Sequence, residues 1–228
     1  MQAIQGVLGD ARTVINVGAG TGNYEPPDRE VVGVEPSTVM IAQRPSGTPP
    51  VIGAAAEALP VRNGAFDAAL AVLTTHHWDD VSRGLAELRR VAERQVIVTF
   101  DPDRNGAFWL VRDYLGASIA LDRARTPSLA TLEDHLGPLQ VQPLPVPRDM
   151  QDGVLAAYWA RPHAYLDAEV RANISSFAQL APDTVDRAMR ALAEDLADGT
   201  WERRNVELRN LDAYDAGYQL ISAGADRT

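Results

Sequence analysis

The chain has 228 residues, of which 46% are hydrophobic and 23% are charged, and its formal net charge is −10. This length and composition predict one folded domain, 1–228, with an elaboration, rather than a disordered chain or two full domains. The negative charge disfavours binding to nucleic acid, because a phosphate backbone repels it. The absence of cysteine excludes disulfides, thiolate metal sites and a cysteine nucleophile.

The hydropathy of the chain and the composition of residues 1–10 indicate where in the cell the protein is expected. No apolar run approaches the roughly 20 residues that cross a bilayer. Residues 1–10 lack the basic region and the sustained apolar stretch of a signal peptide. The sequence therefore predicts a cytoplasmic protein with no membrane partner.

The first part of the chain, 1–102, alternates strand-like and helix-like segments. Apolar and β-branched runs predict strands at 13–17, 30–34, 49–52, 66–73 and 95–100. Helices are predicted at 37–43 and 80–93. Strands joined by helices predict an α/β fold, namely a Rossmann-like, doubly wound, mostly parallel sheet with helices on both faces. Ligands bind such sheets beyond the carboxyl ends of the strands.

The second part of the chain, 103–228, predicts a helical insertion or cap followed by closing strands. The predicted helices cover 105–121, 128–136, 164–178 and 182–197. A last strand is predicted at 214–223, whereas the prolines within 140–147 indicate an edge strand or an extended loop.

The strongest motif is Val-Ile-Asn-Val-Gly-Ala-Gly-Thr-Gly-Asn at 14–23. It places Gly18, Gly20 and Gly22 directly after a predicted strand. Their missing side chains allow a tight turn and let the backbone approach a ligand closely. Glu35 ends the next predicted strand, where a carboxylate can accept hydrogen bonds from the ribose hydroxyls of an adenosine. The alternative interpretation is a glycine-rich turn that binds nothing.

The spacing of the glycines separates two kinds of ligand. Dinucleotide-binding proteins use G-x-G-x-x-G, which requires glycine at position 23, and this chain has Asn23 there. The observed G-x-G-x-G pattern instead suits a ligand with an adenosine but no pyrophosphate.

With these motifs, residues 12–102 resemble class I S-adenosylmethionine (SAM)-dependent methyltransferases of the small-molecule, methyltransferase type 11-like branch. The matching segments are the glycine loop, Val-Gly-Val-Glu-Pro-Ser at 32–37, Gly-Ala-Ala-Ala-Glu-Ala-Leu-Pro at 53–60, Phe-Asp at 66–67 and Leu-Arg-Arg-Val at 88–91. The resemblance keeps the order of the family's motifs, and it is specific for the cofactor but not for the acceptor. It implies SAM as cofactor, S-adenosylhomocysteine (SAH) as product and a small-molecule acceptor.

The resemblance also implies which residues surround the cofactor. In this family the glycine loop runs beneath the methionine moiety, the acidic residue holds the ribose, and the segments that follow lie beside the adenine and the sulfonium. The implied residues are Asn16, Gly18, Ala19, Gly20, Gly22, Glu35, Pro36, Ser37, Met40, Ala56, Glu57 and Leu73.

Two positions depart from the family pattern, which usually has aspartate at both. Asn16 is expected to weaken contacts to the methionine amine. Ala55 leaves recognition of the adenine amino group to backbone groups or to Glu57.

The segment Thr-Thr-His-His-Trp-Asp-Asp at 74–80 follows the fourth predicted strand, and in this fold it faces the transferring methyl group. There His76 or His77 can remove a proton from an acceptor hydroxyl, amine or acidic carbon. The alternative interpretation is that each histidine is structural and that Trp78 fills the core. A metal site is not expected, because adjacent histidines rarely converge on one ion.

Aromatic side chains are the candidates for contacts with the acceptor. They are Tyr24, Trp78, Phe108, Trp109 and Tyr114. The last three lie where small-molecule methyltransferases carry an insertion on the acceptor side, but the favoured interpretation is ordinary core packing of an amphipathic helix. Arg161 has two interpretations, as a partner for an acidic acceptor or as a cap of a turn.

The hypothesis from sequence is a SAM-dependent methyltransferase, acting as a monomer or homodimer, that aligns the acceptor for in-line displacement and excludes water. The alternatives are a SAM-binding enzyme with non-methylating catalysis, such as cyclisation, and a binding protein without turnover. A dinucleotide oxidoreductase is disfavoured by the residue at position 23.

Overall fold

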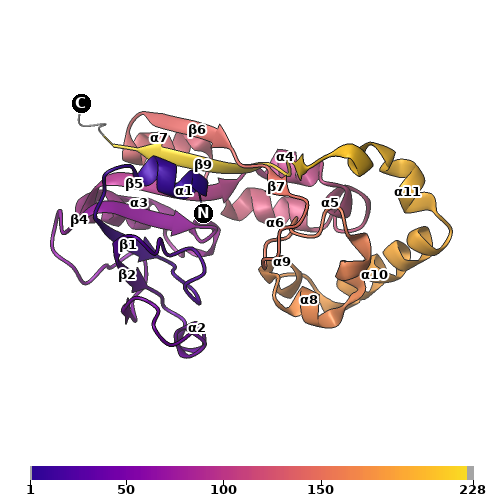
Figure 1. Cartoon of the computed structure of the whole chain (residues 1–228), viewed down its shortest axis with the longest axis horizontal. Helices are drawn as coiled ribbons and strands as arrows, with labels where there is room; N and C mark the ends of the chain where they lie inside the picture. The colour runs from indigo at the N-terminus through magenta and orange to yellow at the C-terminus, as the bar shows by residue number, and fades with distance from the viewer. Residues whose placement is uncertain (1, 225–228) are drawn as a thin grey trace. The chain divides into compact units, whose positions relative to one another are not determined.

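The computed structural model describes residues 2–224 of the chain (Figure 1). Its described residues form two compact units. Unit 1 contains residues 2–99, 125–142 and 219–224, and unit 2 contains residues 100–124 and 143–218.

Unit 1 is built on a seven-stranded sheet with the strand order β3-β2-β1-β4-β5-β9-β6. Its strands are β1 (Thr13–Val17), β2 (Glu30–Val34), β3 (Val51–Ile52), β4 (Phe66–Val72), β5 (Ala92–Phe100), β6 (Leu139–Pro143) and β9 (Tyr218–Ala223). The first five strands pair in parallel with their neighbours. This arrangement confirms the predicted Rossmann-like, mostly parallel sheet.

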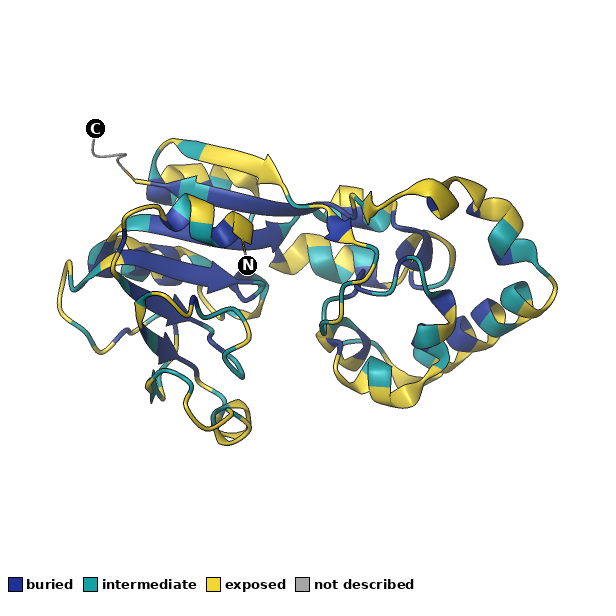
Figure 2. Cartoon of the chain, viewed as in Figure 1, coloured by how far each residue is buried: buried dark blue, intermediate teal, exposed yellow. Residues whose placement is uncertain are grey.

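The central strands are apolar because the sheet is covered on both faces. In β4 the five residues 68–72 are all buried, and Val14, Ile15 and Val17 of β1 are fully buried. The burial colours in Figure 2 show the same dark strands through the middle of unit 1. Such strands read as continuous apolar runs, which is why their positions were predictable.

The helical segments of unit 1 are α1 (Gln2–Leu8), α2 (Thr38–Ala42), η1 (Thr75–His77), α3 (Val81–Val91) and α7 (Leu129–Leu136). Side chains of α3 and α7 share one core with the sheet, and α1 lies against the other face (Figure 1). Ser37, Asp80 and Ser128 cap the starts of α2, α3 and α7, each accepting a hydrogen bond from a backbone N–H.

Two helices of unit 1 differ from the expectation. The helix predicted to run to residue 93 ends at Val91, because Ala92 already pairs with Phe66 in the sheet. Helix α1 was not predicted at all, since its segment is short and only Ile4 and Leu8 are buried.

Unit 2 consists mainly of short helices. Its elements are α4 (Pro102–Gly106), α5 (Trp109–Asp113), α6 (Ser118–Arg125, whose last residue belongs to unit 1), β7 (Val146–Pro147), η2 (Pro162–Leu166), α8 (Ala168–Ala172), α9 (Ser175–Ala178), α10 (Pro182–Ala197), α11 (Thr200–Arg204), η3 (Val206–Asn210) and β8 (Ala213–Tyr214). Helix α10 has the predicted bounds. The continuous helices predicted at 105–121 and 164–178 were wrong, because each region is divided into three short helical segments.

A cluster of aromatic side chains forms the core of unit 2. Trp109 and Trp159 are almost fully buried, and the indole N–H of Trp109 donates to the carbonyl of Trp159 at 2.9 Å. The Trp159 indole N–H in turn donates to the carbonyl of Val146 at 2.9 Å. Ring centroids lie 5.2 Å apart between Trp109 and Trp201, and 5.5 Å apart between Trp159 and Tyr214. Stacked and edge-to-face rings, together with the indole hydrogen bonds of Trp109 and Trp159, hold these short helices together.

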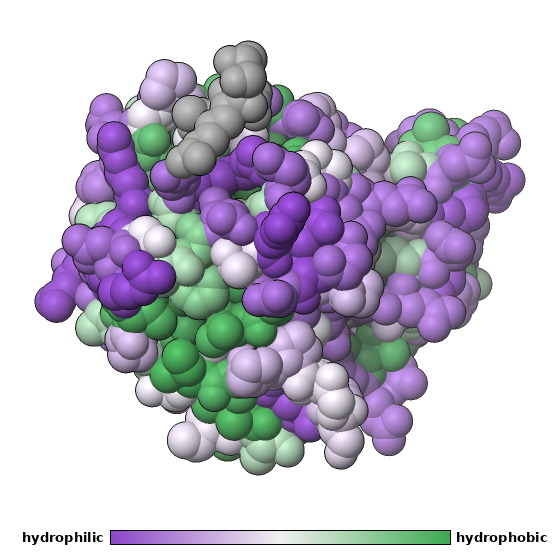
Figure 3. All heavy atoms as spheres, turned by 60° about the vertical axis from the view of Figure 1, so that its left-hand side comes forward, coloured by the Kyte–Doolittle hydropathy of each residue, from purple (hydrophilic) through white to green (hydrophobic). Residues whose placement is uncertain are grey.

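The face shown in Figure 3 is largely hydrophilic, although hydrophobic residues gather in one area low on it. Among residues 2–224, no helix has the length and apolar character that crossing a bilayer requires.

Candidate functional site

The loop after β1 folds back onto the end of β2. The N–H groups of Gly18 and Ala19 both donate to the carbonyl of Val34, at 2.8 and 3.0 Å. The φ angles of Gly18, Gly20 and Gly22 are 73°, 53° and 92°. This left-handed region is strained for residues with a Cβ, so the turn depends on its glycines.

Gly18 also brings the glycine loop against the segment that follows β4. A Cβ at position 18 would lie 2.6 Å from the Cβ of Thr74 and 2.8 Å from its Cγ2. Thr74 is buried and immediately precedes η1, the turn that carries both histidines. The glycine loop and the histidine turn are therefore in direct contact.

Glu35 is fixed beside the glycine loop through both of its carboxylate oxygens. Its Oε2 accepts from the N–H of Gly20 at 2.8 Å, and its Oε1 accepts from the N–H of Ser37 at 2.9 Å. The residue is only 7% exposed. Because each carboxylate oxygen can accept more than one hydrogen bond, Glu35 can still accept from the hydroxyls of a ligand.

Asn16 supplies a buried acceptor one strand away. It lies in β1 between Gly33 and Leu70, is 2% exposed, and its Oδ1 has no hydrogen-bond partner among the described residues. An unsatisfied buried acceptor costs about 1–3 kcal/mol, and a ligand that donates to it removes that cost. An amine donor suits this position.

The remaining predicted cofactor residues lie at the carboxyl ends of the strands. The Cε of Met40 lies 3.4 Å from where a Cβ of Gly20 would be, so Met40 provides apolar surface beside the loop. Ala56 is buried, whereas Pro36 is exposed and Ser37 caps α2. One carboxylate oxygen of Glu57 accepts from the N–H of Asp80 at 3.2 Å, which ties Glu57 to the start of α3.

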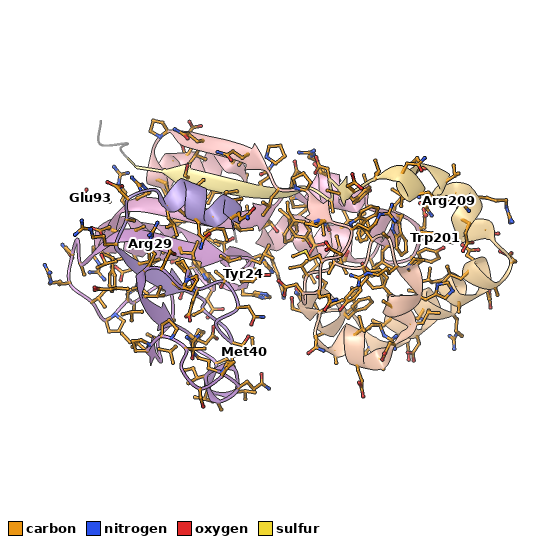
Figure 4. The ribbon with its side chains drawn as sticks, viewed as in Figure 1. Tyr24, Arg29, Met40, Glu93, Trp201 and Arg209 are labelled. Atoms are coloured by element: carbon orange, nitrogen blue, oxygen red, sulfur yellow. The ribbon has the colours of Figure 1, made fainter. Side chains whose placement is uncertain are left out.

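The labelled side chains in Figure 4 mark the two ends of unit 1. Tyr24, which follows β1, and Met40, which follows β2, lie toward one end of the unit. Arg29, which precedes β2, and Glu93, near the start of β5, lie toward the opposite end. The candidate site therefore occupies the carboxyl ends of the parallel strands, where this class of sheet binds ligands.

Leu73 holds an unusual backbone conformation at the end of β4. Its φ is 51°, and no other non-glycine residue in 2–224 has a positive φ. The N–H of Leu73 donates to the carbonyl of Val98 at 2.8 Å, which helps to hold this conformation. Backbone strain of this kind is concentrated at functional sites, which agrees with the predicted place of Leu73 in the cofactor site.

The two histidines lie side by side after β4. Their ring centroids are 4.0 Å apart and their planes are tilted by 43°. Burial, with further contributions from the charges of His77 and Arg125, lowers the pKa of His76 to about 3. Partial burial also lowers the pKa of His77, the charge of Arg125 adds to this, and the charge of Glu35 opposes it. Both imidazoles are therefore neutral near pH 7 and can accept a proton, His76 only weakly.

The lowered pKa of His76 predicts acid-sensitive stability. Between pH 6.5 and about 3 the unfolded chain binds the proton at this residue and the folded protein does not, so stability is lost as the pH falls through this window. We expect the free energy of unfolding of a His76→Gln variant to fall less steeply, by roughly 1 kcal/mol per pH unit. Urea unfolding at pH 4, 5, 6 and 7 measures this slope.

His163→Gln provides the control for this experiment, since His163 is exposed in unit 2. A His76→Gln variant that loses stability with acid as steeply as the wild type would contradict the prediction.

Four of the predicted acceptor contacts have structural partners instead. The Trp78 ring packs on Gly84 of α3, its Cζ3 lying 2.8 Å from where a Cβ of Gly84 would be. Phe108 and Trp109 are buried in the core of unit 2, and the hydroxyl of Tyr114 donates to Asp195 at 2.7 Å. These contacts are those of packing residues.

Arg161 also has partners inside unit 2. Its guanidinium lies over the ring of Tyr158, 4.8 Å from the centroid, and donates to the carbonyls of Met150 and Ala157. These bonds favour the second of its two predicted interpretations, a cap of a turn.

Sequence reasoning missed three residues of the site. Thr74 stands in the quoted histidine segment, but its contact with Gly18 became visible only in three dimensions. Glu25 and Arg44 form an ion pair beside the glycine loop, with N and O atoms 2.8 Å apart. The one signal in the sequence for this ion pair was that an acidic residue follows the glycine loop and a basic residue follows the helix after Glu35.

Comparison with known proteins agrees with this geometry. Residues 15–100 match the family model described as methyltransferase domain. The structure is similar, with a TM-score of 0.89 and 28% identity, to a protein described as a methyltransferase from an antibiotic biosynthesis pathway of Anabaena variabilis, over 98% of this chain and 97% of that one. A comparison with curated protein sequences gives no match.

Two further solved structures resemble parts or all of the fold. A SAM-dependent methyltransferase of Thermotoga maritima, described as a possible histamine N-methyltransferase, aligns with a TM-score of 0.51 and 25% identity over 64% of this chain and 72% of that one. SpnF, described as a [4+2]-cyclase, aligns with a TM-score of 0.51 and 16% identity over 98% of this chain and 79% of that one. The glycine loop and Glu35 both lie within residues 15–100, the part of the chain that matches the methyltransferase domain.

Proposed function

We propose that this chain is a SAM-dependent methyltransferase that acts on a small-molecule acceptor and holds SAM at the carboxyl ends of β1, β2 and β4. The observation that carries the proposal is the position of Glu35, which both the glycine loop and the start of α2 fix through its two carboxylate oxygens. The description of the Anabaena variabilis protein, which refers to antibiotic biosynthesis, supports a small acceptor. The net charge of −10 disfavours a nucleic-acid acceptor.

The residues present fit the cofactor chemically. The orphan Oδ1 of Asn16 suits the amine of the methionine moiety, and the glycine loop offers backbone without side chains beside it. Glu35 accepts from the ribose hydroxyls, and Met40 offers apolar surface for the adenine. When bound, SAM supplies a methyl carbon that its sulfonium charge has already activated.

The chain's own residues then position the acceptor and accept its proton. Thr74 and Leu73 hold the histidine turn against the glycine loop, which aligns the turn with the cofactor segments. We assign the proton-accepting role to His77, because it is exposed and lies within the electrostatic influence of Glu35. His76, with its lower basicity, positions the neighbouring ring.

Glu35→Ala tests the cofactor site. The wild type is expected to bind SAM and SAH, and not NAD, in calorimetric titrations. The variant loses both acceptors for the ligand hydroxyls and the anchor of Gly20, so we expect its affinity for SAH to fall about 30-fold. Glu30→Ala, an exposed residue at the opposite end of β2, is the matched control.

Two results would overturn the proposal. If the wild type binds NAD and neither SAM nor SAH, the cofactor assignment fails. If Glu35→Ala binds SAH as tightly as Glu30→Ala, the assignment of Glu35 fails.

The structural similarity to SpnF favours one second candidate, a reaction other than methyl transfer at the same cofactor site. The two reactions leave different products. Methyl transfer raises the mass of the acceptor by one methylene and converts SAM to SAH. Cyclisation leaves the mass of the acceptor unchanged, so mass spectrometry of an acceptor screen separates the two.

A further inference from the structure

A buried ion pair lies behind the glycine loop. Both carboxylate oxygens of Glu25 accept from Nη2 of Arg44 at 2.8 Å. The two side chains are only 3% and 4% exposed, so the pair is removed from water almost completely. Glu25 follows the glycine loop in sequence, whereas Arg44 follows α2.

The ion pair is bonded directly to the glycine loop. Nη1 of Arg44 donates to the carbonyl of Gly20 at 3.2 Å, and the N–H of Glu25 donates to the carbonyl of Gly22 at 3.3 Å. The N–H of Gly20 donates to Glu35. Charged side chains therefore hold Gly20 through its amide and through its carbonyl.

The space around the pair is filled. A Cβ at Gly22 would lie 3.0 Å from Oε2 of Glu25 and 3.2 Å from Nη1 of Arg44. A Cβ at Gly33 of β2 would lie 3.1 Å from Oε1 of Glu25. The pair thus occupies the gap between the glycine loop and β2, with glycine on each side.

The pair could serve to fill the space between the loop and β2, or to hold the glycine loop in place, and the energetics of buried charges distinguish these two roles. Replacing a buried ion pair by apolar residues of similar volume is often neutral or stabilising, so the pair is not needed merely to fill this space. The guanidinium of Arg44 donates at once to the carboxylate of Glu25 and to the carbonyls of Gly20 and Pro49, which an apolar side chain cannot do. The feature that apolar residues cannot reproduce is therefore the hold on the loop.

We propose that Glu25 and Arg44 are positioning residues for SAM, which fix the carbonyl of Gly20 and thereby the conformation in which the glycine loop receives the cofactor. This inference rests on the proposed function of the loop. It assigns to the pair an effect on cofactor affinity that is separate from its effect on stability.

The decisive variant is the double replacement Glu25→Leu with Arg44→Met, compared with Arg44→Met alone. The single variant leaves a buried carboxylate without its partner, so we expect its melting temperature to fall strongly. In the double variant the melting temperature returns toward that of the wild type, yet the affinity for SAH stays about 10-fold weaker, because the carbonyl of Gly20 still lacks its donor.

Arg94→Met is the matched control. Arg94 is also a partly buried arginine of unit 1 that binds a carboxylate, Asp10, and a backbone carbonyl, that of Leu8, but it lies at the start of β5. We expect this variant to lower the melting temperature and to leave the affinity for SAH unchanged. Calorimetric titration with SAH, well below each melting temperature, and thermal unfolding supply the two readouts.

The outcomes distinguish this inference from the proposed function. A double variant that is stable and binds SAH as tightly as the wild type overturns the positioning role alone. A wild type that binds no SAH overturns the proposed function of the loop. Stable folding with affinity lost only in the Glu25 and Arg44 variants supports both.

Discussion

A Gly18→Ala variant is expected to lose its affinity for SAH by about 100-fold or more. The added methyl group meets two independent obstacles. The φ of 73° costs an alanine about 1–2 kcal/mol, and the methyl group would lie within 2.8 Å of two carbons of Thr74. Because Thr74 is buried and carries the histidine turn, the variant must displace either the glycine loop or that turn.

Gly64→Ala separates these two obstacles. Gly64 has a φ of 57°, but a Cβ there has no neighbour within 4 Å. We expect this control to lose about 1 kcal/mol of stability and none of its affinity for SAH. Equal loss of affinity in the two variants would contradict the contact between Gly18 and Thr74 as the cause. Calorimetric titration and thermal unfolding of both variants provide the measurement.

Trp109→Ala is expected to destabilise unit 2 by about 4 kcal/mol. The change removes a fully buried ring that contacts Tyr165 and Trp201, and it leaves the carbonyl of Trp159 without its donor. Three of the four tryptophans of the chain lie in unit 2, so intrinsic fluorescence during urea unfolding reports chiefly on this unit. Trp109→Phe keeps an aromatic ring and is expected to lose less stability.

Val206→Ala controls for truncation at an exposed position, since Val206 is 55% exposed. If Trp109→Ala were as stable as Val206→Ala, the residue would not be part of the core, and its predicted contact with the acceptor would regain support.

The sequence predicted the sheet well because burial on both faces leaves a simple pattern. β1 and β2 have the predicted bounds, and so does the long helix α10, which Pro182 begins. The helix predicted across 164–178 had its apolar residues at helical spacing, but Asp167 accepts from the N–H of Glu169 and starts a new helix inside it. Apolar residues at helical spacing indicate which residues face the core, but they do not establish that the helix is continuous.

The candidate site was predictable to the extent that its chemistry follows strand ends. Glu35 lies where the sequence placed it, because it directly follows an apolar strand. The aromatic residues of the second part were harder to interpret, since Phe108 and Trp109 have the same appearance in sequence whether they line a pocket or fill a core. The pair of Glu25 and Arg44 depends on a contact across nineteen residues, which no local pattern encodes.

The strand order also constrains when the sheet can be completed during synthesis. β9 is the last strand of the described residues, yet it lies between β5 and β6 in the sheet. As the chain leaves the ribosome, the five parallel strands can pair while β6 has no neighbour to join. The edge of β5, with its unpaired backbone N–H and C=O groups, therefore stays open until all of unit 2 has been made, a period in which aggregation or chaperone binding competes with folding.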